Sequence, residues 1–325
     1  EAFSGCSLLK EINIPASRVY IGEKAFNGCP IETASVNSNF GNLFTNFTTL
    51  KKIDIGNNLT TINERALQWT GIESITIPDN VTKLGMAAFL HCKSLTSVTI
   101  GKGIIQISES CFNGSGLTSI TIPDNVGKYN FGKTIGYNAF KDCKNLTSAF
   151  IGKGIERIDG FNNSGLTSID IPSNVIQIKD KCFKNCTNLT SVTIDDKLIY
   201  DSFYELSNGI HLSQECFDGC SAIESIFIPD RVVNIATASF RHCTNLKEIT
   251  FGNNFNGSIF VDRSTWSRTV FYKSGLKHVY LTQTALNNIN AYLRGKKNTN
   301  QQLYFGGGPD GDQYFFGRWV TIHKI

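Results

Sequence analysis

The chain has 325 residues, of which 41% are hydrophobic, so it carries enough apolar side chains for a sizeable core. No run of 18 or more apolar residues occurs, which excludes a membrane-spanning helix built from this sequence. The net charge of +4 is spread over the whole length, and this weak balance predicts neither nucleic acid nor an anionic membrane surface as a partner.

One six-residue word, Leu-x-x-Ile-x-Ile with apolar exchanges, recurs twelve times along the chain. Its copies begin at Leu9, Ile31, Leu50, Ile72, Leu95, Leu117, Leu146, Leu166, Leu189, Ile223, Leu246 and Leu276. Most copies lie 19 to 23 residues apart, and longer gaps of 29, 34 and 30 residues follow Leu117, Leu189 and Leu246. The alternation of apolar and polar residues predicts a short strand, which the following Pro or Gly ends.

Each repeat continues with a second apolar pair, such as Val81 and Leu84, and then with a turn that contains Phe and, three residues later, Cys. A unit of about 22 residues cannot bury its apolar side alone, so the units must stack around one continuous core. The predicted fold class is an α/β-type repeat solenoid. We expect a parallel sheet on its open face, with short turns and 3-10 or helical segments opposite.

Three words of the repeat carry a family resemblance. They are Ile-Pro-Asp-Asn-Val at 77–81 and 122–126, Ala-Phe-x-x-Cys at 88–92 and 139–143, and Leu-Thr-Ser-x-Thr-Ile at 95–100, 117–122 and 189–194. They resemble the BspA-like leucine-rich repeats, and the resemblance covers about residues 1–281. It implies a leucine-rich-repeat solenoid without catalytic residues. It also implies a surface-exposed or secreted protein of a host-associated microbe, with roles in adhesion to host or matrix proteins or in binding other cells.

The repeat predicts two parts, a solenoid of about twelve units at 1–281 and a C-terminal cap at 282–325. The solenoid opens within a repeat word at 2–6, so we expect further repeats or a trimmed leader upstream. The long gaps predict loops at 127–138, 196–214 and 253–274, with an extra hairpin over 197–212. In the cap we expect a helix over 282–294, with Thr284 as its N-cap, and a hairpin of two strand-like runs around Gly306–Gly311.

Every one of the ten cysteines has a fixed place in the repeat. Seven follow an aromatic residue by three positions, and the other three, Cys111, Cys182 and Cys216, directly precede Phe. In repeats that lack one of the seven cysteines, the equivalent position of the repeat holds Ser115, Ser164 or Thr70. This exchange indicates that a small side chain is required there rather than a thiolate. We therefore expect a ladder of buried free thiols.

Two other arrangements of the cysteines are open to the sequence. One is a set of disulfides between neighbouring repeats, and the other is zinc held by Cys182, Cys186, Cys216 and Cys220. Stacked repeats keep the Cβ vectors parallel, and an intervening Phe separates the two cysteine columns. Both points disfavour these arrangements, so no metal site is predicted.

No other group of residues predicts catalysis or a cofactor. Ser225, Glu248 and His278 share a column, but this order leaves Ser225 about 10 Å from His278, which is too far for a hydrolytic triad. The glycines at 306–311 predict a tight turn rather than a phosphate-binding loop. The sequence has nine N-glycosylation sequons, several of which arise because the repeat contains Asn-Leu-Thr, and their use requires a eukaryotic secretory route.

The remaining signal is the open face, where the outward residues of the twelve words form two columns made mostly of Ser and Thr. This composition also follows from strand propensity and solubility alone. Three aromatic residues, Phe150, Phe227 and Tyr280, interrupt the columns and predict a contact stripe. The candidate binding residues are these three together with Asp170, Glu248 and His278.

The predicted function is therefore binding without catalysis, cofactor or metal. We expect a host or matrix protein, or a glycan, as the partner, and an extracellular or cell-surface location. A structural spacer that presents another domain is the alternative, and an intracellular scaffold would fit the reduced cysteines.

Overall fold

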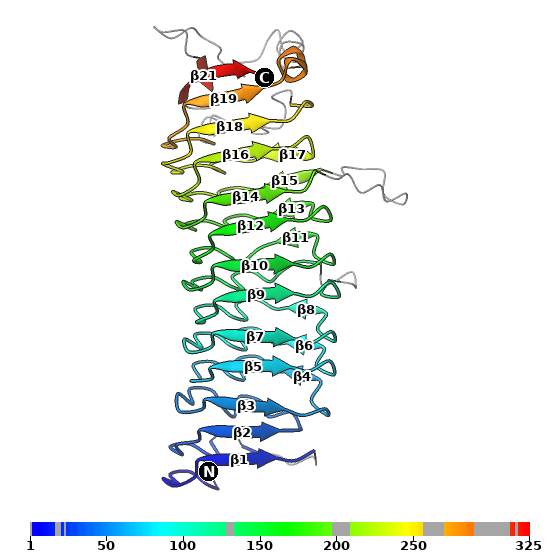
Figure 1. Ribbon diagram of the computed structural model, residues 1–325. Helices are drawn as coiled ribbons and strands as arrows, with labels where there is room; N and C mark the ends of the chain where they lie inside the picture. The colour runs from blue at the N-terminus through cyan, green and yellow to red at the C-terminus, as the bar shows by residue number, and fades with distance from the viewer. Residues whose placement is uncertain are drawn as a thin grey trace. The chain divides into compact units, whose positions relative to one another are not determined.

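The computed structural model describes residues 2–16, 21–22, 24–127, 133–196, 209–255, 270–288, 313–315 and 318–325. The chain divides into two compact units, unit 1 at Glu1–Leu166 and unit 2 at Thr167–Ile325. Each unit is a stack of repeats, here called rungs, and each is described by itself (Figure 1).

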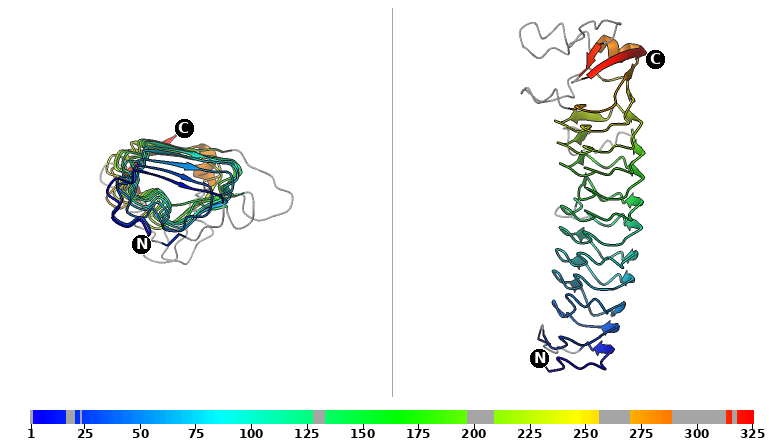
Figure 2. Two further views of the ribbon diagram at one scale, coloured as in Figure 1. Left: turned by 90° about the horizontal axis from the view of Figure 1, so that it is seen from below. Right: turned by 90° about the vertical axis from the view of Figure 1, so that its left-hand side faces the viewer.

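The repeat words of unit 1 form its long strands. These are β1 (Glu11–Ile14), β2 (Thr33–Val36), β3 (Lys52–Ile55), β5 (Ser74–Ile77), β7 (Ser97–Ile100), β9 (Ser119–Ile122) and β10 (Ser148–Ile151). The strands pair in parallel and in register as β1–β2–β3, β5–β7 and β9–β10. Backbone hydrogen bonds from Glu73 N to Lys51 O and from Thr118 N to Thr96 O join the three groups. In the right-hand view of Figure 2 these strands lie along one side of the coil.

Short strands form a second parallel ladder in unit 1. They are β4 (Thr61–Ile62), β6 (Lys83–Leu84), β8 (Gln106–Ile107) and β11 (Arg157–Ile158). β4, β6 and β8 pair in register, so that Leu84 stacks between Ile62 and Ile107. These apolar residues are fully buried, as are Val81 and Ile104 on the approach to the short strands. The second apolar pair of each repeat therefore faces the long strands across the core, as the sequence predicts.

Unit 2 repeats the same plan. Its long strands are β12 (Ser168–Ile171), β14 (Ser191–Ile194), β16 (Ser225–Ile228), β18 (Glu248–Phe251) and β19 (His278–Leu281), and its short strands are β13 (Gln177–Ile178), β15 (Ile210–Leu212) and β17 (Val232–Ile235). Pairing is parallel along β12–β14, along β16–β18–β19 and along β13–β15–β17. All twelve words are thus four-residue strands, which confirms the predicted repeat and its parallel sheet.

The turns that carry Phe and Cys form a third ladder, built from backbone in alternating conformations. Ala87 and His91 have φ values of 55° and 57°, in the left-handed region, while Phe89 lies between them. The amides of these three residues donate to the carbonyls of Glu109, Cys111 and Asn113 on the next rung. The same alternation recurs in the neighbouring turns, for example at Lys181 and Asn185. Where the sequence predicts 3-10 or helical segments opposite the sheet, the described residues form these turns and the short strands.

The third ladder stacks the phenylalanine rings. In unit 1 the rings of Phe89, Phe112, Phe140 and Phe161 follow one another with centroids 5.0, 5.5 and 4.9 Å apart. In unit 2 the rings of Phe183, Phe217, Phe240 and Phe271 are 5.3, 5.5 and 5.6 Å apart. All eight rings are fully buried. Large apolar areas removed from water, together with ring stacking, make this column a main source of stability.

The corner after each long strand depends on its neighbour. A Cβ on Gly101 would lie 2.5 Å from Ile77 O, and one on Gly152 would lie 2.5 Å from Ile122 O. Glycine is therefore needed where a corner packs on the Pro corner of the preceding rung. In the Pro corners, Asp79 accepts a hydrogen bond from Lys102 N at 2.7 Å on the next rung. Asn80 donates to Leu59 O at 2.6 Å on the preceding rung, so its sequon amide is already engaged.

The predicted loops lie largely outside the described residues, which omit 128–132, 197–208 and 256–269. Of the predicted hairpin over 197–212, the described part, β15, instead pairs in parallel with β13 and β17. Leu198, Tyr200 and Phe203 lie outside the described residues.

The C-terminal segment continues the sheet of unit 2. Helical backbone spans 283–288, and Thr282 is its N-cap, since Thr282 Oγ1 accepts a hydrogen bond from Ala285 N at 3.1 Å. The sequence predicts Thr284 as the N-cap, and this prediction is wrong, because Thr284 lies within the helix. β20 (Gln313–Phe315) and β21 (Arg318–Lys324) pair in antiparallel fashion, and β21 also pairs in parallel with β19.

Left-handed residues in the turns give the first test. Arg65 is exposed and has a φ of 54°, whereas Lys83 is exposed in the extended strand β6. Because a side chain at positive φ is strained, Arg65→Gly should raise the free energy of unfolding by about 0.5 to 1 kcal/mol. Lys83→Gly should lower it by a similar amount, because glycine weakens a strand. Urea unfolding of both variants checks the opposite signs, and two decreases would contradict the strain.

Candidate functional site

Phe150 interrupts the open face of unit 1. Its side chain on β10 is 59% exposed, and its neighbour in register on β9 is Thr121. The outward side chains of β5, β7 and β9 are all Ser or Thr. The predicted aromatic exception in unit 1 is therefore a large apolar ring in water beside a hydroxyl-lined surface.

Phe227 holds the equivalent outward position on a long strand of unit 2. It lies on β16, is 49% exposed, and begins a row of outward residues that continues through Thr250, Tyr280 and His323 on β18, β19 and β21. Tyr280 is half-buried, because its ring stacks on that of His323 with centroids 4.7 Å apart and planes 18° apart. The prediction that Tyr280 is an exposed aromatic is therefore wrong, since β21 covers one side of the ring.

Glu248 and His278 form the second row of the same face. They are neighbours in register on β18 and β19, between Ser225 on β16 and Thr321 on β21, and both are half-buried. His278 Nδ1 lies 3.1 Å from His323 Nε2, so the two imidazoles share a hydrogen bond. The sequence did not identify His323 as a site residue, because it lies outside the repeat words. The strand-like run at 314–322 could have indicated it, because pairing this run with β19 places the next residue, His323, beside Tyr280.

The six predicted site residues therefore fall into three places. Phe227, Glu248, His278 and Tyr280 lie together on β16, β18 and β19 of unit 2, where His323 joins them; we call these five residues the front cluster. Asp170 is exposed on β12 of unit 2, in register with Thr193 on β14. Phe150 belongs to unit 1.

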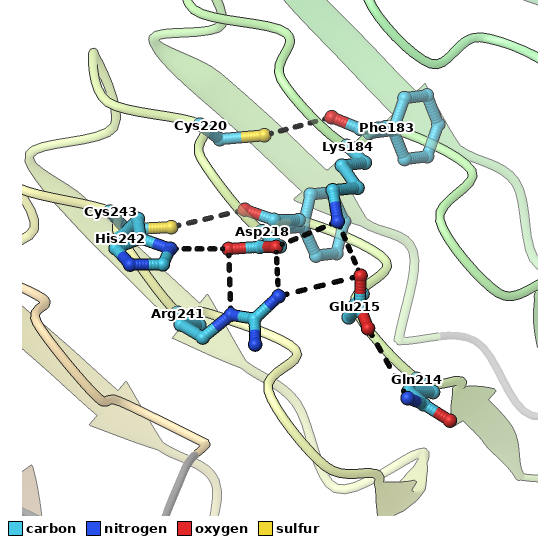
Figure 3. Close-up of polar contacts among 10 residues, drawn as sticks. Phe183, Lys184, Gln214, Glu215, Asp218, Cys220, Arg241, His242 and Cys243 are labelled. Atoms are coloured by element: carbon cyan, nitrogen blue, oxygen red, sulfur yellow. Dashed lines mark hydrogen bonds and ion pairs between the residues drawn. The ribbon is translucent and has the colours of Figure 1, made fainter.

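A network of charged residues lies on the turns of unit 2 and was not predicted. Asp218 follows Phe217 in the Phe-x-x-Cys word, and its side chain is only 4% exposed. Arg241 on the next rung binds it through two hydrogen bonds of 3.2 and 2.7 Å (Figure 3). His242 Nδ1 lies 3.0 Å from the same carboxylate, and Lys184 Nζ on the preceding rung lies 3.2 Å from it. Glu215 binds Lys184 at 2.5 Å and lies 3.5 Å from Arg241.

The network holds its carboxylates ionised. Burial opposes the ionisation of Asp218, but hydrogen bonds from Arg241, His242 and Lys184 outweigh it and lower the pKa of this carboxyl. Burial likewise opposes ionisation of Glu215, and its contacts with Lys184 and Arg241 lower its pKa. Three rungs of unit 2 are therefore joined by alternating positive and negative side chains.

The cysteines form a ladder of thiols, nine of them buried and Cys6 exposed. The Sγ atoms of Cys92, Cys143 and Cys220 donate to backbone carbonyls of the preceding rung at 3.0 to 3.1 Å. Burial raises the pKa of Cys92 and of Cys143 to about 11. Thr70 and Ser115, which replace Cys in this column, contact the next cysteine at 3.3 Å. The exchange of Cys with Ser and Thr predicts a small side chain in this column, and the structure adds that Thr70 and Ser115 also contact the next thiol.

In the described part of the chain, no group of three or more His, Cys, Asp or Glu side chains is placed to hold a metal ion. None of the helical segments that the structure describes is long and apolar enough to cross a membrane.

Comparison with known proteins identifies the repeat. The sequence profile of the BspA type leucine rich repeat region, which spans six copies of the repeat, matches residues 1–85, 41–133, 130–213 and 210–301. No curated protein sequence matches the chain.

Solved leucine-rich repeat structures also resemble this chain. A leucine-rich repeat protein from Bacteroides ovatus is 20% identical, with 97% of this chain and 92% of that chain covered and a TM-score of 0.44. The pneumococcal vaccine antigen PcpA is 17% identical, with 89% and 88% covered and a TM-score of 0.47. A leucine rich cell surface protein from Faecalibacterium prausnitzii is 20% identical, with 86% and 90% covered and a TM-score of 0.40.

The charged network predicts a specific dependence of stability on pH. Because the pKa of Asp218 is lowered in the folded state, its contribution is complete above the carboxyl pKa of the unfolded chain, about 3.9, and is lost as the pH falls through the folded value. Asp218→Asn should therefore lower the free energy of unfolding by about 2 kcal/mol at pH 7, because Arg241 and Lys184 then keep, among the described residues, only Glu215 as an anionic partner. The difference from the parent should shrink between about pH 5 and pH 2.

Urea unfolding of both proteins across this pH range measures the effect. Glu224→Gln is the matched control, because Glu224 and Lys247 form an exposed pair at 3.9 Å and contribute little. A deficit of Asp218→Asn that stays constant from pH 7 to pH 2 would show that packing, not charge, is responsible.

The thiols give an independent prediction. In the folded protein, an Ellman-type reagent should modify one thiol rapidly, that of Cys6, because the other nine are buried. After denaturation without reductant, about ten thiols should react. As a control, Cys6→Ser should abolish the rapid reaction of the folded protein and leave the other thiols unaffected. A count near zero in the denatured protein would mean that the cysteines are paired as disulfides.

Proposed function

The chain belongs to the BspA-type leucine-rich repeat family, and from this premise we infer that it is a non-catalytic, cell-surface or secreted protein that binds a host or matrix protein, or a glycan. Location outside the cell is what membership of this family implies. The open faces of the long strands, one in each unit, are the proposed contact surfaces, with Phe150 as the anchor in unit 1 and the front cluster as the anchors in unit 2.

The exposure of the two phenylalanines is the observation that carries this proposal. Phe150 and Phe227 are 59% and 49% exposed, on strands whose other outward residues include Ser148 and Ser225. Solvation of such a ring is unfavourable, and neither the strand nor the core needs it at an outward position. Aromatic side chains of this kind are the residues that most often dominate binding energy in protein interfaces.

The environments of the nucleophilic groups support binding over catalysis. Burial raises the pKa of the Cys92 and Cys143 thiols, so these two carry little thiolate at neutral pH. Ser225 lies in register with Glu248, and His278 lies beyond Glu248, about 10 Å from Ser225 by strand spacing. A serine nucleophile requires the histidine within hydrogen-bond distance.

Two other functions fit the same repeat. A structural spacer needs no exposed aromatic residues, so Phe150 and Phe227 argue against it. An intracellular scaffold would fit the free thiols, but burial protects thiols in an oxidising compartment as well. Exposed phenylalanines without any measurable partner would favour the spacer.

The proposal predicts that Phe150→Ser and Phe227→Ser, combined, weaken binding at least tenfold while leaving the melting temperature nearly unchanged. Truncation of an anchoring ring costs about 2 kcal/mol or more in affinity, whereas these rings lie outside the core. Panels of immobilised matrix proteins and of glycans identify a ligand, and titration then compares the variants. Tyr137→Ser is the matched control, because Tyr137 is 54% exposed but lies on a turn.

Two results would contradict the prediction in different ways. Unchanged binding by a folded double variant would move the contact away from the open face. A large decrease in melting temperature would show that the rings stabilise the fold and do not serve a partner.

A further inference from the structure

The imidazole pair of the front cluster has the geometry of a chelate. His278 Nδ1 and His323 Nε2 lie 3.1 Å apart, on the neighbouring parallel strands β19 and β21. Two nitrogens bound to one zinc ion, each about 2.0 to 2.1 Å from it, lie about 3.4 Å apart in a tetrahedral site and about 2.9 Å apart at a right angle. The observed separation falls between these values, so the nitrogens need to move by only a few tenths of an ångström. Both rings must also turn, so that the lone pairs, which now lie along the hydrogen bond, converge on the ion.

We propose that His278 and His323 bind a divalent transition-metal ion of the kind that prefers imidazole, with Zn²⁺ as the representative. The two nitrogens now share one proton in their hydrogen bond. When the ion binds, the donating ring moves this proton to its outer nitrogen through solvent, and both contacting nitrogens become ligands. Both rings stay neutral, so no oxidant or additional reactant is needed.

The surroundings of the pair suit such an ion. Glu248 is the neighbour of His278 in register on β18 and brings a carboxylate to within one strand spacing on the side away from β21. Within the described residues the two imidazoles have no third protein ligand already in place, so water completes the coordination. Tyr280 stacks on His323 and holds one side of its ring.

Metal binding would connect the last strand to the repeat. β21 is held to β19 by backbone hydrogen bonds, among them Thr321 N to Lys277 O at 2.7 Å and Ile325 N to Leu281 O at 3.0 Å. An ion bound by one histidine from each strand adds a side-chain link across the same pair. Because the ion binds only when the strands are paired, it should stabilise the pairing of β21 with β19.

The experiment uses the full chain with Cys6→Ser, because the exposed Cys6 thiol is a competing zinc ligand. Titration with Zn²⁺ should show one site per chain by calorimetry. In imidazole NMR spectra, the signals of His278 and His323 should shift and those of His91, His211 and His242 should not. Hydrogen exchange at the Thr321 and Ile325 amides should slow when zinc is bound.

His278→Gln and His323→Gln should each weaken zinc binding at least tenfold, while His211→Gln, the matched control on β15, leaves it unchanged. If His323→Gln releases β21, seen as fast amide exchange without zinc, His278→Gln provides the test, because His278 lies on a repeat strand. Zinc binding of parental strength in either folded histidine variant would overturn the proposal, as would the absence of any one-to-one binding by the parent.

Discussion

The structure depends on one constraint, the alternation of left-handed and right-handed backbone in the turns that carry Phe and Cys. Ala87 and His91 are in the left-handed region, so the amides of Ala87, Phe89 and His91 all donate to carbonyls of the next rung. The strain of each left-handed residue, about 1 to 2 kcal/mol, is offset by these bonds and by burial of the ring between them. The fixed spacing then forces Phe89 onto Phe112, directs thiols such as that of Cys92 at a carbonyl of the preceding rung, and keeps the long strands in register.

Sequence alone predicted what every rung repeats. The twelve strands, their parallel pairing and the burial of the second apolar pair follow from the word Leu-x-x-Ile-x-Ile, because neighbouring rungs present the same residues to each other. Contacts between a repeat and a segment that departs from the repeat could not be predicted from the repeated word. Tyr280 is covered by His323, a residue 43 positions later and outside the repeat. Arg231 is 2% exposed where an Asn is usual, and its guanidinium reaches back to Asp195 O at 2.8 Å.

The charged network shows the same limit and its physical reason. Lys184, Asp218 and Arg241 hold one position of the Phe-x-x-Cys word in three rungs, so their signs alternate along a column. Rungs about 4.8 Å apart bring side chains of one column into contact, and like charges there repel each other. Aligning the words in the sequence shows this alternation. The contact between Lys184 and Glu215, which are 31 residues apart and hold different positions of the word, is seen only in the structure.

The same electrostatic argument explains the open face. A column that repeats one charged residue accumulates repulsion at every rung, whereas Ser and Thr can recur without cost and still favour a strand. A hydroxyl-lined face is therefore the default of this repeat, and it carries little information about function. Departures from it are informative because stacking does not require them. On unit 2 they gather on β16, β18 and β19, where a phenylalanine, a glutamate, a histidine and a tyrosine replace hydroxyl residues within three strands. An aromatic anchor beside an acid and a pair of imidazoles can contact a partner and hold an ion, and these are the two roles proposed for that cluster.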